Sequence, residues 1–494
     1  MTQSQPTVAI AGGGLAGLAA ACALSDAGFR VTLFEKRPFL GGRASSYEHP
    51  GTGEVVDNCQ HVLFRVCTNL VKFYEHIGVA DQIRWFDQMN FVEPGGRISV
   101  MKSSPLPAPL HTAPSFLRLP FLSSTDKLAI TRALVPLTLT VQPDNGQTFQ
   151  QWLDAHGQTK NAVGRFWHPI LISALSEELD RISVSAAAQV VRESMKTPAA
   201  RHMGVPTLPL TDLYNAAGDY VRTHGGTLHF RCPIESFAAG ASQVRVRTLG
   251  NNSATADEIF DYLVLALSFD ALESLLPSGA ESSPLREKIS HFENSPITGI
   301  HLWFDRQISD LDHAVLLDRT VQWMFHKSRL QPMRTQSRQE RERHDLVRAV
   351  KVPNQNGALA PEGGSYIELV VSSSKTLIDK SRAEIVDLAL SEVREFFPGA
   401  RAANLVKSTV IKEVNATYSP RPGIDAHRPT PVTPWPRVFL AGDWTATGWP
   451  ATMEGAVRSG YLAAEALADA SGTKGARFLS PDMPASGLMR LFVK

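Results

Sequence analysis

The stretch that decides the fold is TVAIAGGGLAGLAAACALSDAG, residues 7–28, in which a short β-rich run precedes clustered glycines and an alanine-rich helix. Three of the glycines have the GxGxxG spacing. In a strand–turn–helix unit the first permits a tight turn, the second lets backbone approach a pyrophosphate, and the third lets the helix pack closely on the strand. N–H groups at the start of the helix then face the phosphates. The contacts expected here are Gly12, Gly14, Leu15, Ala16 and Gly17.

A second strand and an acidic residue complete this dinucleotide-binding unit. The run RVTLF, residues 30–34, is followed directly by Glu35 and Lys36. An acidic side chain at this strand end accepts hydrogen bonds from ribose hydroxyls. The unit by itself does not distinguish FAD from NAD.

The residues after Glu35 add a second glycine turn. The stretch KRPFLGGRAS contains Gly41, Gly42 and Arg43. Two glycines let the chain pass close to a ligand, and an arginine beside them can hold a phosphate.

The other end of the chain carries a matching half of the site. PRVFL, residues 436–440, predicts a buried strand that leads into AGDWTATGWPATMEGAVRSGYLAAEAL. Ligands of α/β sheets collect at such strand ends. From Met453 onward, small residues recur at helical spacing and allow close packing. The contacts expected here are Gly442, Asp443, Met453, Glu454 and Ala456.

Together the two halves resemble the flavin amine oxidase and phytoene desaturase superfamily. The resemblance implies an α/β fold, with a Rossmann-like FAD-binding domain and an interleaved α+β substrate domain floored by an antiparallel sheet. It also places Arg43 near the pyrophosphate and flavin, Asp443 on the ribityl–phosphate part, and the backbone of Ile234 against the adenine. Residues 437–467 contain no cysteine, so we expect FAD to be bound noncovalently.

The domain boundaries follow from these motifs. We expect an FAD-binding domain of residues 1–84, 204–283 and 420–470, a substrate domain of residues 85–203 and 284–419, and a tail of residues 471–494. Alternating runs with aromatic residues predict the antiparallel sheet, and a helix is expected over 381–397. The runs are 297–305, 321–325, 365–372 and 410–418.

Composition narrows the class of protein. The net charge is +1, which gives no global field toward nucleic acid. The four cysteines form no CxxC pair, so no metal site is expected, and the compartment is expected to be the reducing cytoplasm. No signal peptide is evident, and no apolar run reaches the length of a spanning helix. The arginine-rich residues 327–348 predict a solvated loop, or secondarily a contact with anionic lipid or a partner.

Residues 104–141 are apolar, punctuated by proline and poor in charge. They predict either helices that roof a buried pocket or an entrance that dips into a membrane. The last residues, GLMRLFVK, could add a short anchor. We therefore expect peripheral association with the inner face of the cell membrane. The side chains expected to touch lipid are Phe116, Leu117, Leu119, Phe121 and Leu122.

Residues 56–63, VDNCQHVL, make the resemblance more specific. They are similar to the D-N-G-Q-H-V-L stretch of the squalene-associated FAD desaturases, understood as hydroxysqualene dehydroxylases of hopanoid biosynthesis. The stretch FWHPILISALSEELDRIS, residues 166–183, agrees. Cys59 departs from the pattern because it stands at an expected glycine. The resemblance places Gln60 and His61 beside the flavin.

The activity that this implies is reductive removal of the allylic hydroxyl of hydroxysqualene to give squalene. Such chemistry needs a proton donor and a dry apolar tunnel. His61 is expected to be the acid or a residue that orients water, with Asp57 setting its tautomer, and a structural histidine is the alternative. His168 and Glu177 are the next candidates for the acid. The chain has no second strand–GxGxxG–helix unit, so electrons are expected from an external donor.

Three other functions remain open. A carotenoid-type desaturase shares the fold and the oily pocket. An amine oxidase is less favoured because ATGWPAT offers one aromatic residue, Trp449, without an obvious partner for an amine cage. A non-catalytic prenyl-binding escort is disfavoured because the FAD motifs are intact.

Overall fold

The computed structural model describes residues 5–250, 254–331, 363–473 and 475–492. At its centre is a five-stranded sheet in the order β10-β2-β1-β14-β20, and every neighbouring pair in it is parallel. The α/β fold expected from the glycine motifs is therefore confirmed. The strands come from three separate parts of the chain: β1 (Thr7–Ala11), β2 (Arg30–Glu35), β10 (Thr227–Phe230), β14 (Tyr262–Leu265) and β20 (Val438–Leu440).

Helix α1 (Leu15–Asp26) is buried along almost its whole length because it packs on the sheet and against α15 (Met453–Ser471). A helix that is covered on all sides is apolar all round, as this alanine-rich sequence is. At the crossing, a side chain on Gly460 would come within 2.9 Å of the Ala20 amide nitrogen. The small residues of α15 thus let the two helices touch backbone to backbone. Helix α9 (Leu210–Thr223) also contacts α1.

A second, seven-stranded sheet has the order β19-β15-β18-β17-β16-β7-β8. Its pairs are antiparallel except for β16 with β7. The antiparallel sheet predicted from the alternating runs is thus confirmed, as is the helix α14 (Arg382–Phe396), which Ser381 caps. The strands are β7 (Gln88–Val92), β8 (Ile98–Lys102), β15 (Asn294–Phe304), β16 (His313–Leu316), β17 (Trp323–His326), β18 (Ser365–Ser372) and β19 (Leu405–Tyr418).

Smaller sheets connect these parts. The segment 225–237 contributes to two different sheets. Its first strand, β10, joins the parallel sheet. Its second, β11 (Ile234–Ala239), belongs to a three-stranded sheet with β12 (Val244–Leu249) and β13 (Thr255–Phe260), in the order β11-β12-β13. A further sheet, β5-β9-β6, lies where the expected domain boundaries at 84/85 and 203/204 fall. Its strands, and those of a two-stranded sheet, are β5 (Leu63–Phe64), β6 (Ile83–Phe86), β9 (Met203–Pro206), β3 (Ser46–Glu48) and β4 (Val55–Asp57).

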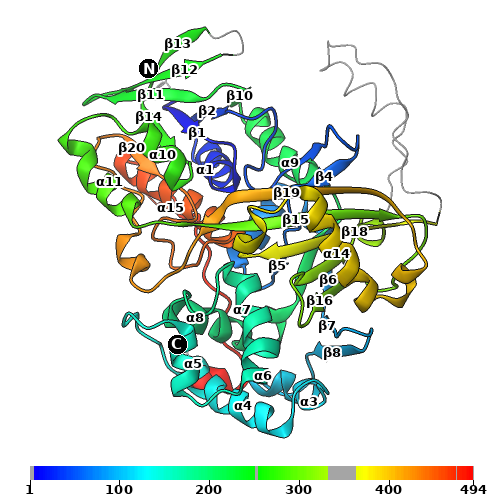
Figure 1. Ribbon diagram of the computed structural model, residues 1–494. Coiled ribbons are helices and arrows are strands. Elements are labelled where there is room, and N and C mark those ends of the chain that lie inside the picture. The colour runs from blue at the N-terminus through cyan, green and yellow to red at the C-terminus, as the bar shows by residue number, and fades with distance from the viewer. Residues whose placement is uncertain (1–4, 251–253, 332–362, 474, 493–494) are drawn as a thin grey trace.

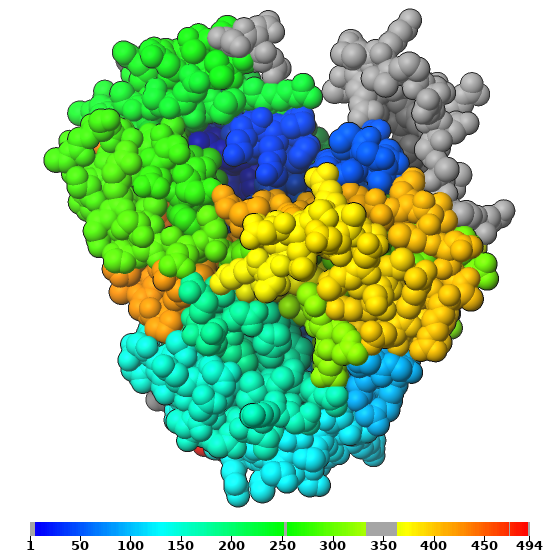
Figure 2. Space-filling view, viewed as in Figure 1, coloured from blue at the N-terminus to red at the C-terminus, as the bar shows by residue number. Residues whose placement is uncertain are grey.

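A helical lobe forms the end of the molecule opposite β11–β13 (Figure 1), and Figure 2 shows it in cyan and teal. It shields an apolar core beneath the seven-stranded sheet. The helices are α3 (Ala113–Leu117), α4 (Ser124–Leu139), α5 (Phe149–Ala155), α6 (Lys160–Ala162), α7 (His168–Leu175) and α8 (Val184–Met195).

The packing of this lobe shows that most of the side chains expected to touch lipid are not on its surface. Four of the five side chains expected to touch lipid are buried in the core of the lobe, and Leu117 alone is exposed, at 62%. These four belong to one hydrophobic core cluster, in which the ring of Phe116 contacts Phe166 and that of Phe121 contacts Phe91. The C-terminal η9 (Gly487–Leu491) lies beside the lobe (Figure 1), where the Leu488 N–H donates to the Ala108 carbonyl at 2.9 Å. The buried four are Phe116, Leu119, Phe121 and Leu122.

Two further expectations concern the chain's surface. Among the described residues, no helix is long and apolar enough to span a bilayer. Of the arginine-rich stretch 327–348, residues 332–348 lie outside the described part of the chain. Its first residue, Lys327, begins α12 (Lys327–Leu330) and is 2% exposed, so the expectation of a solvated loop is wrong for this residue.

Candidate active site

A continuous cavity of about 910 Å³ runs from the carboxyl ends of the parallel strands toward the helical lobe. Every residue expected to contact the cofactor lines this cavity except Gly17. Motifs more than 400 residues apart in the chain therefore meet at one site. The lining includes Gly12, Gly14, Leu15, Ala16, Glu35, Lys36, Gly41, Gly42, Arg43, Gln60, His61, Ile234, Gly442, Asp443, Met453, Glu454 and Ala456.

The two glycine turns touch each other. A side chain on Gly42, whose φ is +60°, would place its Cβ 3.0 Å from the Cα of Gly14. A side chain on Gly17 would collide with the carbonyl oxygen of Gly12. Gly17 therefore holds α1 against β1, the packing role expected of the third glycine. The turn as a whole leaves bare backbone facing the cavity.

Glu35 ends β2 and is 5% exposed. Its Oε2 accepts the Gly13 N–H at 2.6 Å, and its Oε1 accepts the Arg37 N–H at 2.8 Å. Each carboxylate oxygen keeps a further lone pair. The side chain thus ties down the glycine turn and can still accept ribose hydroxyls.

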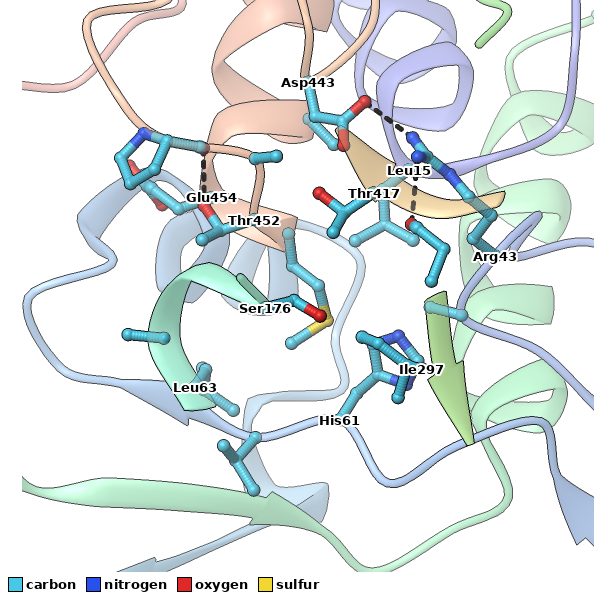
Figure 3. A pocket seen from close by; sticks show the side chains of 18 of the residues that line it. Leu15, Arg43, His61, Leu63, Ser176, Ile297, Thr417, Asp443, Thr452 and Glu454 are labelled. Carbon is cyan, nitrogen blue, oxygen red and sulfur yellow. Dashed lines mark hydrogen bonds and ion pairs between the residues drawn. The ribbon is translucent and has the colours of Figure 1, made fainter. Parts of the chain in front are cut away.

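Arg43 and Asp443 join the N-terminal and C-terminal motifs. Arg43 Nη2 lies 2.6 Å from Asp443 Oδ1, and its Nη1 donates to the Ala416 carbonyl at 3.1 Å. Burial opposes the charge of Arg43, but the carboxylate of Asp443 outweighs it, so the pKa of Arg43 lies above its ordinary value. Figure 3 shows the pair on one wall of the cavity, across from His61.

Glu454 lines the cavity at the start of α15, and its side chain binds a neighbouring helix. Its carboxylate accepts the Leu70 N–H at 2.7 Å and the Asn69 N–H at 3.2 Å, at the start of α2 (Thr68–His76). Burial raises its pKa. The side chain therefore caps another helix. Thr452 caps α15 by accepting the Gly455 N–H at 3.1 Å.

His61 extends toward the middle of the cavity (Figure 3). Its Nδ1 lies 2.7 Å from the carbonyl oxygen of Cys59. A carbonyl only accepts, so Nδ1 carries the proton and the neutral ring keeps a lone pair on Nε2. No described residue bonds Nε2. Burial lowers the pKa of His61 from its ordinary value of 6.5. In this tautomer the neutral ring offers Nε2 as a proton acceptor at neutral pH, whereas the role expected from the sequence was that of an acid.

Asp57 does not contact His61, contrary to expectation. Its Oδ2 lies 2.6 Å from Lys327 Nζ, which also donates to Gln60 Oε1 at 2.9 Å. Lys327 Nζ lies 3.4 Å from Glu368 Oε2. These side chains form a buried charge cluster behind the 57–61 stretch, and its three titratable members, Asp57, Lys327 and Glu368, are at most 2% exposed. The tautomer of His61 is set by the Cys59 carbonyl.

Cys59 fits where the family pattern has glycine. Gly299 on β15 leaves room for this stretch, since a side chain there would come within 3.1 Å of the Asn58 carbonyl oxygen. Burial raises the pKa of the Cys59 thiol well above its ordinary value, and it raises that of Cys67, which also lines the cavity. Both thiols are therefore protonated and weakly nucleophilic.

The next candidates for a catalytic acid, His168 and Glu177, do not line the cavity. His168 pairs with Glu178 at 3.1 Å on the surface. The buried carboxylate of Glu177 binds Lys375 and accepts the Ser419 hydroxyl. Both have structural partners, and neither can reach a ligand in the cavity.

The sequence did not indicate Arg201, which lines the cavity, nor the side chains that make the rest of its wall apolar. Within the described ranges, one surface group, Glu287, His291 and His427, brings three potential metal ligands within 4.8 Å of one another. It is not part of the cavity wall. The apolar wall includes Met89, Phe91, Met101, Leu134, Phe166, Trp167, Ile170, Trp323 and Phe325.

Sequence comparison places these features in a known context. The signature of the family described as flavin containing amine oxidoreductase matches residues 15–468. The 15-cis-phytoene desaturase of Synechococcus elongatus is 26% identical over 482 residues, 93% of this chain and 95% of that protein. The probable zeta-carotene desaturase of the same organism is 26% identical over 491 residues, 94% of this chain and 98% of that protein.

Solved structures agree on the fold. An oxidoreductase from Methanosarcina mazei superimposes with a TM-score of 0.66 at 16% identity, over 94% of this chain and 99% of that one. Cyclohexylamine oxidase from Brevibacterium oxydans gives 0.62 at 17% identity, over 95% of this chain and 100% of that one.

Proposed function

Because the chain belongs to the flavin-containing amine oxidoreductase family and is an FAD-dependent oxidoreductase, we propose that it acts on a long apolar isoprenoid. The wall of the cavity supports this proposal, since nine apolar or aromatic side chains, named above, extend it beyond the glycine motifs. A cavity of about 910 Å³ is within the range of small-molecule sites. The desaturases to which the chain is similar are named for phytoene and zeta-carotene.

The first candidate reaction is desaturation of a carotenoid-type polyene. FAD supplies the hydride acceptor, which takes hydride from one carbon of the new double bond. The neighbouring carbon must lose a proton, and His61 offers a free Nε2 lone pair toward the cavity. The lowered pKa of His61 keeps that nitrogen unprotonated at neutral pH. The unprotonated Nε2 of His61 carries the proposal, because desaturation needs a base, whereas dehydroxylation needs an acid.

The second candidate is reductive dehydroxylation of hydroxysqualene to squalene, with reducing equivalents from an external donor. It is supported by the likeness of residues 56–63 to the hydroxysqualene dehydroxylases. It is also supported by Arg201, whose guanidinium can donate to a hydroxyl in the cavity. His61 would then orient the substrate and would not protonate it.

One experiment separates the two candidates. The FAD-loaded protein is incubated with phytoene under oxidising conditions and, in parallel, with hydroxysqualene and dithionite. A longer polyene chromophore in the first arm supports desaturation, and squalene in the second supports dehydroxylation. Absence of both products would contradict an isoprenoid substrate.

We predict that Glu35→Ala weakens FAD binding by about 1 to 3 kcal/mol, because charge-assisted hydrogen bonds to ribose are lost. FAD affinity is measured by equilibrium dialysis. Glu35 also accepts two backbone N–H groups, so Glu35→Gln is the matched variant that keeps the shape and removes the charge. Unchanged FAD affinity in both variants would show that the ribose lies elsewhere.

FAD is expected to be released by acid precipitation. Covalent attachment through sulfur needs a thiolate, and burial raises the pKa of both cavity thiols, Cys59 and Cys67. The yellow chromophore should therefore remain in the supernatant. Chromophore in the pellet would contradict noncovalent binding.

Peripheral membrane contact is proposed through a different surface from the one first expected. Exposed apolar side chains lie on the 106–117 segment and on the C-terminal segment bonded to Ala108. We predict that Leu117→Asp/Leu491→Asp reduces flotation with liposomes of mixed anionic lipid, because burial of this apolar area is lost. The control Ile259→Asp/Val406→Asp changes equally exposed residues on other elements. Equal flotation of the two variants would exclude this surface.

A further inference from the structure

Arg201 lies where the main cavity meets a small surface cleft. It ends η4 (Pro198–Arg201) and lines both spaces. Met89 and Met101 line both spaces with it, and Asp87, Lys102 and Ser103 line the outer one, with no ion pair between Asp87 and Arg201. The side-chain contact of its guanidinium is Nη2 to the Met101 sulfur at 3.7 Å. Thioether sulfur is a weak acceptor, so the guanidinium keeps most of its donors free.

The other cations that line the cavity either have a carboxylate partner or lie at its cofactor end. Arg43 is paired with Asp443, and Glu193, a carboxylate that lines the cavity, is paired with Lys196 at 2.8 Å. Lys36 and Arg37 flank Glu35 at the end where the glycine turns lie. In contrast, no carboxylate in the described part of the chain lies within ion-pair distance of Arg201.

No neighbouring group in the described part of the chain balances the positive charge of Arg201. Burial lowers its pKa to about 10, so it is still charged at neutral pH. His111 lies near enough that burial, and then the charge of Arg201, lower the pKa of this histidine to about 4. His111 is fully buried and therefore neutral. Arg201 is half-buried and lines the outer cleft as well as the cavity. A ligand that displaces water from its guanidinium must supply an acceptor, since a charge left without water or a partner is destabilising.

We propose that Arg201 binds an oxygen acceptor on the apolar ligand of this cavity, an inference that rests on the isoprenoid substrate proposed above. The acceptor is a carboxylate, carbonyl or hydroxyl oxygen carrying at most one negative charge. A diphosphate is disfavoured, since the single guanidinium here would leave most of its charge unbalanced. A pure hydrocarbon would displace water from Arg201 and return no hydrogen bond. The cavity therefore favours oxygenated isoprenoids over hydrocarbons of the same length, which supports the second candidate reaction, on hydroxysqualene, over the first.

The test uses C15 probes that share one chain. Farnesoic acid, farnesol, farnesyl diphosphate and farnesene are titrated into the FAD-loaded protein, and quenching of tryptophan fluorescence is followed, since Trp167, Trp323 and Trp449 line the cavity. We expect farnesoic acid to bind about 10- to 100-fold more tightly than farnesene, with farnesol between them. Arg201→Met should abolish this preference while farnesene binding stays or improves, and Arg201→Lys should keep part of it.

The matched control is Arg245→Met, which removes an arginine that is exposed on β12, away from the cavity wall. It should bind all probes as the wild type does. Equal affinity of the acid and the hydrocarbon for the wild type would overturn the role of Arg201 and leave an apolar ligand standing. Tightest binding of the diphosphate would overturn the limit on charge. If no probe binds, both this inference and the isoprenoid substrate are wrong.

Discussion

Replacing His61 by alanine should lower turnover of the FAD-loaded protein by about 10²- to 10⁴-fold, the usual contribution of a positioned general base. The Cys59 carbonyl fixes the proton on Nδ1 and leaves Nε2 free toward the cavity. Alanine removes that lone pair and leaves FAD binding to the glycine motifs. FAD content is measured by absorbance in each preparation, so a loss of cofactor is not mistaken for a loss of chemistry.

The pH profile distinguishes a base from an acid. Burial lowers the pKa of His61 from 6.5, and a base acts in its unprotonated form. The rate should therefore be constant around neutral pH and fall only as the pH drops below 6.5. An acid would show the opposite limb, with the rate rising as the pH falls. His61→Ala should lose the acid limb along with most of the rate.

A matched control is His224→Ala, which changes an exposed histidine bonded within its own helix to the Tyr220 carbonyl. Its rate and pH profile should equal those of the wild type. Near wild-type turnover in flavin-loaded His61→Ala would show that this histidine is structural. Because His168 and Glu177 do not line the cavity, the base would then have to be sought among its other polar lining residues.

Local sequence patterns predicted the cofactor end of the molecule because local geometry determines it. A GxGxxG turn between a strand and a helix leaves few conformations open to the backbone. Glu35 and Asp443 then follow from their positions at strand ends, and the structure brings all these elements to one cavity. The alternating runs predicted β15, β18 and β19 for the same reason, since a period of two residues belongs to a half-buried strand.

The other end of the site depends on contacts between distant residues, which no local pattern records. Arg201 has no sequence motif, and its importance lies in the absence of a carboxylate within ion-pair distance of it in the described structure. The sequence around Phe116 and Phe121 would be equally apolar if these side chains faced lipid or a core. Only the packing of the lobe shows that they are buried. The partner of Asp57 is 270 residues away in the chain.

Substitution of that partner, Lys327, is expected to have the largest effect on the stability of the protein. Burial raises the pKa of Glu368 to about 8, so its carboxyl is protonated at pH 7 and Lys327 balances Asp57 alone. Lys327→Met would leave the Asp57 carboxylate buried without a counter-charge. We expect the free energy of unfolding to fall by about 3 to 5 kcal/mol, the usual cost of breaking a buried pair on one side. Chemical denaturation with FAD present measures this change.

The double variant Lys327→Met/Asp57→Asn separates lost charge balance from lost packing. With the carboxylate removed as well, most of the stability should return, since replacing both members of a buried pair is often nearly neutral. Arg247→Met breaks an exposed pair with Asp257 on the β12–β13 hairpin and should change the stability little. A double variant as unstable as Lys327→Met would show that the lysine acts through its contact with Gln60 and its packing. The buried charge cluster would then hold the 57–61 stretch by shape and hydrogen bonding, with no requirement for charge balance.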